Sequence, residues 1–185
     1  MFETILSAFG VVALSEMGDK TQLLAFSLAA RFKKPWQVML GILLATILNH
    51  ALASTVGNWV ASQIAPRTLS YVLAFTFFAF GIWTLKPDEL EEQEEESKYG
   101  ALVTTTLLFF IAEMGDKTQL ATVALAAQFR SAVWVTVGTT AGMLFTDGLA
   151  VLVGEKLAEK IPMKYVRWTA AATFIAFGIY ILVAG

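Results

Sequence analysis

Six long apolar segments take up almost the whole chain of 185 residues, and they constrain its fold more than any other feature. Their bounds are 3–30, 36–61, 68–86, 99–127, 132–154 and 165–184. At about 1.5 Å per residue, a helix over each segment is long enough to cross a hydrocarbon core of roughly 30 Å. A bilayer admits only helices or a closed barrel, whose strands would be about half as long. The sequence therefore predicts an all-α integral membrane protein with six transmembrane helices.

The chain is also one unit written twice. Of the 72 positions from Leu14 to Leu85, 28 carry the same residue as the position 97 residues later, without a gap. The octapeptide "EMGDKTQL" occurs in both copies, and "TFFAFGIWTL" aligns with "TFIAFGIYIL". Shared apolar composition would give far fewer identities, so this is an internal repeat. We expect three-helix repeats at 1–86 and 99–185, joined by an acidic linker at 87–98.

Each repeat holds three segments, and three is an odd number. The second repeat must then enter the membrane from the opposite side to the first. Inverted repeats of this kind are typical of secondary transporters, whose ion sites lie near the bilayer midplane on broken helices. We expect the first and fourth segments, which carry the octapeptides, to lie at the centre.

Basic residues support this parity. One predicted side has only Arg67 and Arg130. The other has nine, namely Arg31, Lys33, Lys34, Lys86, Lys98, Lys156, Lys160, Lys164 and Arg167. By the positive-inside rule the crowded side is cytoplasmic, so the linker is cytoplasmic and both termini are extracytoplasmic. The N-terminal residues lack a basic region and a cleavage site, so we expect a retained helix there and not a signal peptide.

Each octapeptide places charges in the middle of an apolar segment. On a continuous helix, Glu16, Asp19 and Lys20 would share one face, because they are spaced i, i+3 and i+4. The second copy repeats this pattern at Glu113, Asp116 and Lys117. Gly18 and Gly115 would permit an unwound turn or a close backbone approach.

The cost of these charges points to a ligand. An ionised group at the bilayer centre costs about 2.5 to 3.5 kcal/mol even on lenient scales. Four carboxylates against two lysines leave two negative charges, which one divalent cation or two protons would balance. Lys20 and Lys117 would compensate the remaining charge. The alternative is that these residues form only structural ion pairs between the two segments.

Further polar residues extend the candidate site. Hydroxyl and amide oxygens of Thr21, Thr118, Gln22 and Gln119 would complete a hard ligand set suited to Mg²⁺, Ca²⁺ or Mn²⁺. The chain has no cysteine, which excludes thiolate metal sites and thiol nucleophiles.

Four other residues have weaker claims on function. The thioethers of Met17 and Met114 would favour Mn²⁺, although methionine is also a common apolar filler. His50 and Asp147 align at the repeat offset, as do Asn49 and Thr146. His50 and Asp147 fit a proton relay, with polar packing between helices as the alternative.

The paired Glu-x-Gly-Asp-Lys-Thr motifs resemble those of the calcium/manganese:cation antiporter family, which includes bacterial manganese exporters and Golgi calcium/manganese transporters. The resemblance covers essentially the whole chain. It implies that the cation site is formed by Glu16, Asp19, Glu113 and Asp116. It also implies that Lys20, Thr21, Lys117 and Thr118 complete the motifs. The chain resembles short bacterial forms without an organellar leader, which implies Mn²⁺ efflux across the inner membrane.

We therefore expect a secondary transporter that exports Mn²⁺ from the cytoplasm in exchange for protons. A Ca²⁺/H⁺ antiporter is the nearest alternative, and a passive divalent-cation channel or a membrane-embedded hydrolase represents a different class. An enzyme would normally place unequal residues in unequal roles. Two identical octapeptides favour alternating access instead. The expected partners are the divalent cation, protons and the lipid bilayer, with no cofactor, nucleic acid or obligate protein partner.

Overall fold

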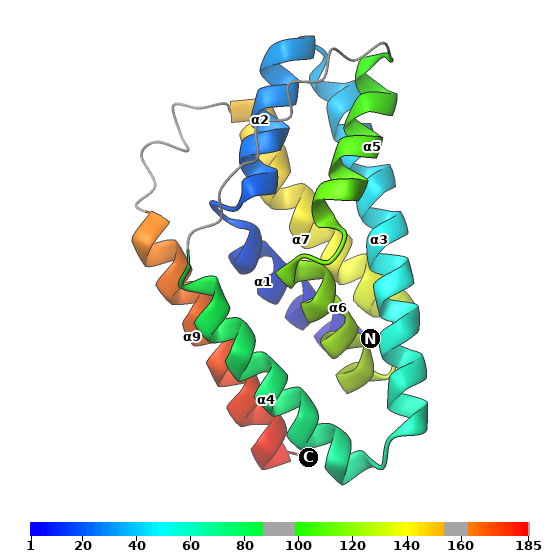
Figure 1. The fold of residues 1–185 in the computed structure, drawn as a ribbon, viewed down its shortest axis with the longest axis vertical. Coiled ribbons are helices and arrows are strands. Elements are labelled where there is room, and N and C mark those ends of the chain that lie inside the picture. The colour runs from blue at the N-terminus through cyan, green and yellow to red at the C-terminus, as the bar shows by residue number, and fades with distance from the viewer. Residues whose placement is uncertain (87–98, 154–162, 185) are drawn as a thin grey trace.

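The structure, a computed structural model, describes residues 1–86, 99–153 and 163–184 as helices joined by short turns (Figure 1). The helices are α1 (Phe2–Glu16), α2 (Lys20–Phe32), α3 (Pro35–Gln63), α4 (Pro66–Thr84), α5 (Ala101–Glu113), α6 (Lys117–Phe129), α7 (Ala132–Val153) and α9 (Met163–Ala184). The predicted linker at 87–98 lies outside the described residues. The fold is therefore all-α over the described part of the chain, as the sequence predicts.

Four predicted segments correspond to single helices, α3, α4, α7 and α9. The other two, 3–30 and 99–127, are each divided into a pair, α1 with α2 and α5 with α6. These four shorter helices have 13 to 15 residues and reach only about 20 Å, so none of them spans a bilayer alone.

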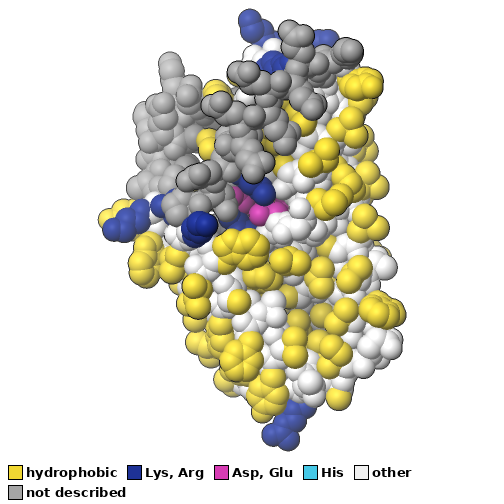
Figure 2. Space-filling model, viewed as in Figure 1, with side chains coloured by type: hydrophobic (Ala, Val, Ile, Leu, Met, Phe, Trp, Pro, Cys, Tyr) yellow, Lys and Arg dark blue, Asp and Glu magenta, His cyan; other side chains and the backbone are white. Residues whose placement is uncertain are grey.

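Within the described residues, three stretches are long and apolar enough to cross a membrane by length and composition: Pro35–Gln63, Ala132–Leu152 and Lys164–Val183. Large apolar side chains cover much of the outside of the molecule (Figure 2), among them Trp36, Phe75 and Val183. Such a surface suits contact with lipid chains and not with water.

The helix ends show how the repeat sets local structure. Lys33 and Arg130, which are repeat equivalents, end α2 and α6 in the left-handed conformation, with φ of 53° and 49°. Proline begins α3 at Pro35 and α4 at Pro66, where its missing N–H would have no helical partner. The chain therefore reverses at short turns, and the helices lie side by side (Figure 1).

The two repeats interlace. The α1–α2 pair of the first repeat packs on α7 of the second, and the α5–α6 pair of the second packs on α3 of the first. Glycines permit the close approach, because an ideal Cβ on Gly41 would lie 2.7 Å from Thr105 and one on Gly138 would lie 2.8 Å from Ala8. Gly41 and Gly138 are repeat equivalents, as are Ala8 and Thr105, so the two contacts are reciprocal.

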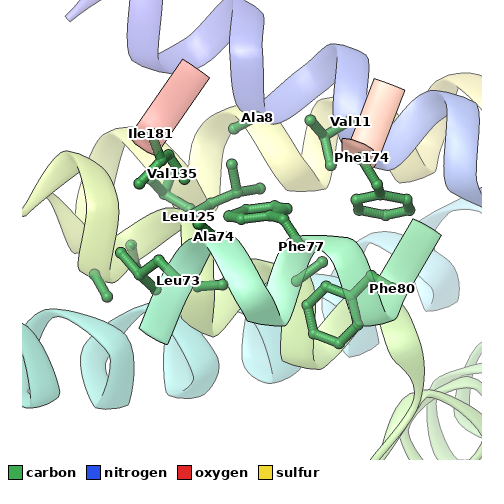
Figure 3. Packing of buried hydrophobic residues seen from close by; sticks show 14 of the residues in the cluster. Ala8, Val11, Leu73, Ala74, Phe77, Phe80, Leu125, Val135, Phe174 and Ile181 are labelled. Atoms are coloured by element: carbon green, nitrogen blue, oxygen red, sulfur yellow. The ribbon is translucent and has the colours of Figure 1, made fainter. Parts of the chain in front are cut away.

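Helices α4 and α9 form a second reciprocal contact along one edge of the molecule (Figure 1). The rings of the repeat equivalents Phe77 and Phe174 lie 6.2 Å apart between centroids (Figure 3). Gly81 faces Ile175, and its equivalent Gly178 faces Phe78. The core around these phenylalanines includes buried residues from both repeats, so the repeats share this core.

This packing predicts unequal effects of adding one methyl group. A Cβ at Gly57 would collide with the backbone carbonyl of Val123 in α6, whereas a Cβ at Gly10 meets no atom of the described residues within 4 Å. Gly57→Ala should lower the free energy of unfolding by about 1–3 kcal/mol. Gly10→Ala should be neutral or stabilising, because alanine is the better helix former. Thermal unfolding in detergent measures both, and equal midpoints would contradict the packing.

Candidate cation site

Each octapeptide breaks its helix. Glu16 ends α1, Gly18 has a φ of 82°, and Asp19 caps α2 by accepting a hydrogen bond of 2.7 Å from the Lys20 N–H. In the second copy Gly115 has a φ of 79°. A side chain at either glycine would be strained, so glycine is required for the break.

The expectation that the motif charges share one face of a continuous helix is therefore wrong. Glu16 lies at the carboxyl end of one helix, and Asp19 and Lys20 lie at the amino end of the next. The positive φ at Gly18 interrupts the helical period between them. The charges are brought together by the break itself, which the two glycines permit.

The lysines pair across the two motifs. Lys20 Nζ lies 3.3 Å from Asp116 Oδ1, and Lys117 Nζ lies 3.0 Å from Asp19 Oδ2. The contacts are reciprocal but their surroundings differ, since the side chain of Lys20 is 27% exposed and that of Lys117 only 4%. Each ion pair therefore fastens one break to the other.

Three of the four predicted carboxylates form a compact group. Glu16, Asp19 and Asp116 are buried, and each offers an oxygen within 4.8 Å of the others. Glu113 is fully buried as well, but it is not one of the three, and neither of its oxygens has a hydrogen-bond partner among the described residues. Figure 2 shows acidic atoms at one spot on the face drawn, between lysine or arginine atoms.

The threonines make the site unequal. Thr21 donates a hydrogen bond of 2.6 Å to Glu16 Oε2, and Thr118 of the other motif donates to Glu16 Oε1. Glu16 thus accepts both hydroxyls, while Glu113, its repeat equivalent, accepts neither. Two identical octapeptides therefore have different contacts in one structure.

The glutamines contact both the breaks and neighbouring helices. Gln22 Oε1 accepts from the Gly18 N–H at 2.9 Å, and Gln119 Oε1 accepts from the Gly115 N–H at 2.7 Å. The amide nitrogen of Gln22 donates to the backbone carbonyl of Thr146, at 3.0 Å. The amide nitrogen of Gln119 approaches the side chain of Asn49, at 3.4 Å.

The methionines of the two motifs differ in position. Met17 lines a small pocket with Gly18 and Asp19, whereas Met114 is 58% exposed. The wall of this pocket also includes Thr84, which the sequence did not single out, and Arg167, which the sequence placed only among the basic residues of the cytoplasmic side. Thr84 aligns with Ile181, so a hydroxyl at an apolar repeat position was the signal that could have found it.

His50 and Asp147 lie on α3 and α7, both fully buried. Within the part of the chain that the structure describes, neither the ring nitrogens of His50 nor the carboxylate oxygens of Asp147 have a hydrogen-bond partner. Asp147 interacts electrostatically with Glu16 and Glu113, so it belongs to the same charged cluster.

The cluster as a whole is suited to a hard cation. Carboxylate and hydroxyl oxygens are ligands that Ca²⁺, Mg²⁺ and Mn²⁺ prefer. Asp147 raises the carboxylates to five, and two lysines balance two of them, so full ionisation would leave three negative charges. A divalent cation neutralises two of these charges, and a bound proton would neutralise the third.

Comparison of the sequence with known proteins shows its family. The sequence profile described as "Divalent cation/proton antiporter GDT1" matches residues 4–92 and again residues 101–185. A protein of Vibrio cholerae described as "Putative manganese exporter" is 44% identical over 169 residues, which cover 91% of this chain and 84% of that protein.

Relatives of lower identity are described as members of the same family. A GDT1-like protein of Synechocystis is 29% identical over 191 residues, covering 91% of each chain. GDT1-like protein 3 of Oryza sativa is 28% identical over 206 residues, covering 97% of this chain and 73% of the plant protein. No solved structure matches the chain. The profile matches together cover nearly the whole chain, which therefore belongs to the GDT1 family of divalent cation/proton antiporters, a family of membrane transporters and not of enzymes.

Proposed function

We propose that the protein exports Mn²⁺ from the cytoplasm across the bacterial inner membrane in exchange for protons. The observation that carries this proposal is the buried group of Glu16, Asp19 and Asp116 where two broken helices meet. Its oxygens are hard ligands, and its charge calls for a divalent ion. The Vibrio cholerae relative, described as a manganese exporter, supports Mn²⁺ as the substrate.

The proposed architecture is a six-helix inverted repeat with halves at 1–86 and 99–185. Reciprocal contacts support it, because a two-fold axis turns each contact between equivalent residues into its partner. Gly41 with Thr105 and Gly138 with Ala8 form one such pair of contacts. The crossed lysine–aspartate bridges form another. Three helices in each half put the two halves in opposite orientations.

The orientation rests on the basic residues. The cytoplasmic side is proposed to be the side of the α2–α3 turn, which carries Lys33 and Lys34, with the acidic linker there and both termini on the other side. In Figure 1 this turn lies at the top, and both termini lie in the lower half. Single cysteines introduced at either end of the helices would test this. In vesicles of known orientation, an impermeant thiol reagent labels only the cysteines on the outer side, and the chain has no cysteine of its own to remove.

The transport cycle depends on competition for the same oxygens. With the site open to the cytoplasm, Mn²⁺ binds as the carboxylates lose protons, and after the change of access external protons displace the ion. Lys20 and Lys117 stay on the aspartates when the ion is absent and limit the excess negative charge. Asp147, buried beside the cluster, is the proposed proton relay, and His50 is the second candidate.

The proposed exchange couples Mn²⁺ movement to a proton gradient. In liposomes with the membrane voltage clamped, an acidic interior should drive Mn²⁺ uptake above the external concentration, because protons leave as the ion enters. Lower pH on the Mn²⁺ side should raise the KM for Mn²⁺, since protons occupy the carboxylates. Parallel measurements with Ca²⁺ and Mg²⁺ give the ion preference. Equilibration without accumulation would indicate a passive channel, and preferred Ca²⁺ transport would indicate the Ca²⁺/H⁺ alternative.

Glu16 gives a direct test of the proposed cation site. Glu16→Gln removes a charge from the group of three. It should weaken Mn²⁺ transport more than about tenfold, because losing even a residue that only supports a metal ligand costs about that much. The control is Glu3→Gln, the same change at an exposed position in the first turn of α1, which should leave transport unchanged. Wild-type rates for Glu16→Gln would exclude this carboxylate from the site.

A further inference from the structure

We propose that Gln22 and Gln119 are positioning residues and not ion ligands. Each fixes the broken turn of its own motif and fastens that turn to the long helix of the other repeat. The inference deepens the proposed function, since it assigns the part of the site that keeps the carboxylates in place while access changes.

The amide oxygen of each glutamine bonds within its own motif. Asp19 caps α2, so Gln22 is its third helical residue, the position from which a side chain reaches back to a free N–H before the helix. Its oxygen accepts from the Gly18 N–H, and the same bond forms between Gln119 and Gly115. The bond to Gly18 is part-buried and the bond to Gly115 is exposed, so leaving the N–H unpaired would cost more in the first motif. In both copies, therefore, the one glutamine atom that suits a hard cation is directed at the glycine.

The amide nitrogen of each glutamine contacts the other repeat. The Gln22 amide nitrogen donates to the Thr146 carbonyl, which joins α2 to α7. The Gln119 amide nitrogen contacts Asn49 Oδ1, and Asn49 Nδ2 donates to the Phe110 carbonyl at 3.0 Å. The second connection thus joins α6, α3 and α5. These helices also pack together, so the hydrogen bonds lie inside units that are already in contact.

The two connections between repeats depend on different kinds of atom, a backbone carbonyl in one and a side chain in the other. Thr146 contributes its backbone carbonyl, and its hydroxyl donates to the carbonyls of Gly142 and Met143 within α7. Asn49 contributes its side chain. Asn49 and Thr146 are repeat equivalents, so changing each side chain should break one connection and spare the other.

The decisive variant is Gln22→Glu, assayed in liposomes with Mn²⁺. A carboxylate retains the acceptor for the Gly18 N–H but has no donor for the Thr146 carbonyl. The maximal rate should fall about tenfold, as expected for a lost buried hydrogen bond that leaves an acceptor unpaired, and the KM for Mn²⁺ should not decrease. A lower KM with the wild-type rate would show that Gln22 is a ligand, because a carboxylate binds the ion more strongly.

The matched pair is Asn49→Leu and Thr146→Val. Asn49→Leu should lower the maximal rate by about tenfold, while Thr146→Val should stay within about twofold of wild type. Equal rates for the two variants would overturn the inference. If Asn49→Leu does not accumulate, the Gln22→Glu comparison still decides. If the wild type transported Ca²⁺ and not Mn²⁺, the proposed substrate would be wrong, and the same variants assayed with Ca²⁺ would test the glutamines.

Discussion

The rest of the site depends on two crossed ion pairs, Lys20 with Asp116 and Lys117 with Asp19. A buried charge without a partner costs several kcal/mol, so neither motif is tolerable alone in an apolar interior. Each motif therefore supplies the counter-ion for a charge of the other motif, because each lysine pairs with the aspartate of the other copy. The crossed pairs hold Asp19 and Asp116 near Glu16, so three carboxylates lie close together, which is the condition for binding a divalent cation.

The apolar segments and the internal repeat could be predicted because apolar length and duplication are visible in the letters, although the structure divides two of the six segments into helix pairs. Three of the four predicted carboxylates lie together, and Glu113 is not one of them. The sequence did not predict contacts. The helical spacing of Glu16 and Asp19 gave the wrong reason for their proximity, since the chain leaves the helix at Gly18. Nothing in two identical octapeptides indicates that Thr118 bonds to Glu16, or that Asn49 connects three helices. Such contacts depend on the packing of distant helices.

The interlaced packing explains why the site lies between the repeats. The broken helices of one repeat rest on the long helix of the other, and small residues such as Gly41 and Gly138 allow the backbones to touch. The core around Phe77 draws on both repeats as well. A single repeat would lack most of the surface against which its own helices are packed. The candidate cation site and the stability of the fold therefore depend on the same contacts.

The unequal threonine contacts separate two glutamates that stand in identical octapeptides. Glu16 accepts both hydroxyls, although the octapeptide around Glu113 has the same residues. The difference must therefore come from surroundings that are not duplicated, such as Asn49 against Thr146 and Thr84 against Ile181. The positions at which the two repeats differ thus decide which glutamate receives the hydroxyls.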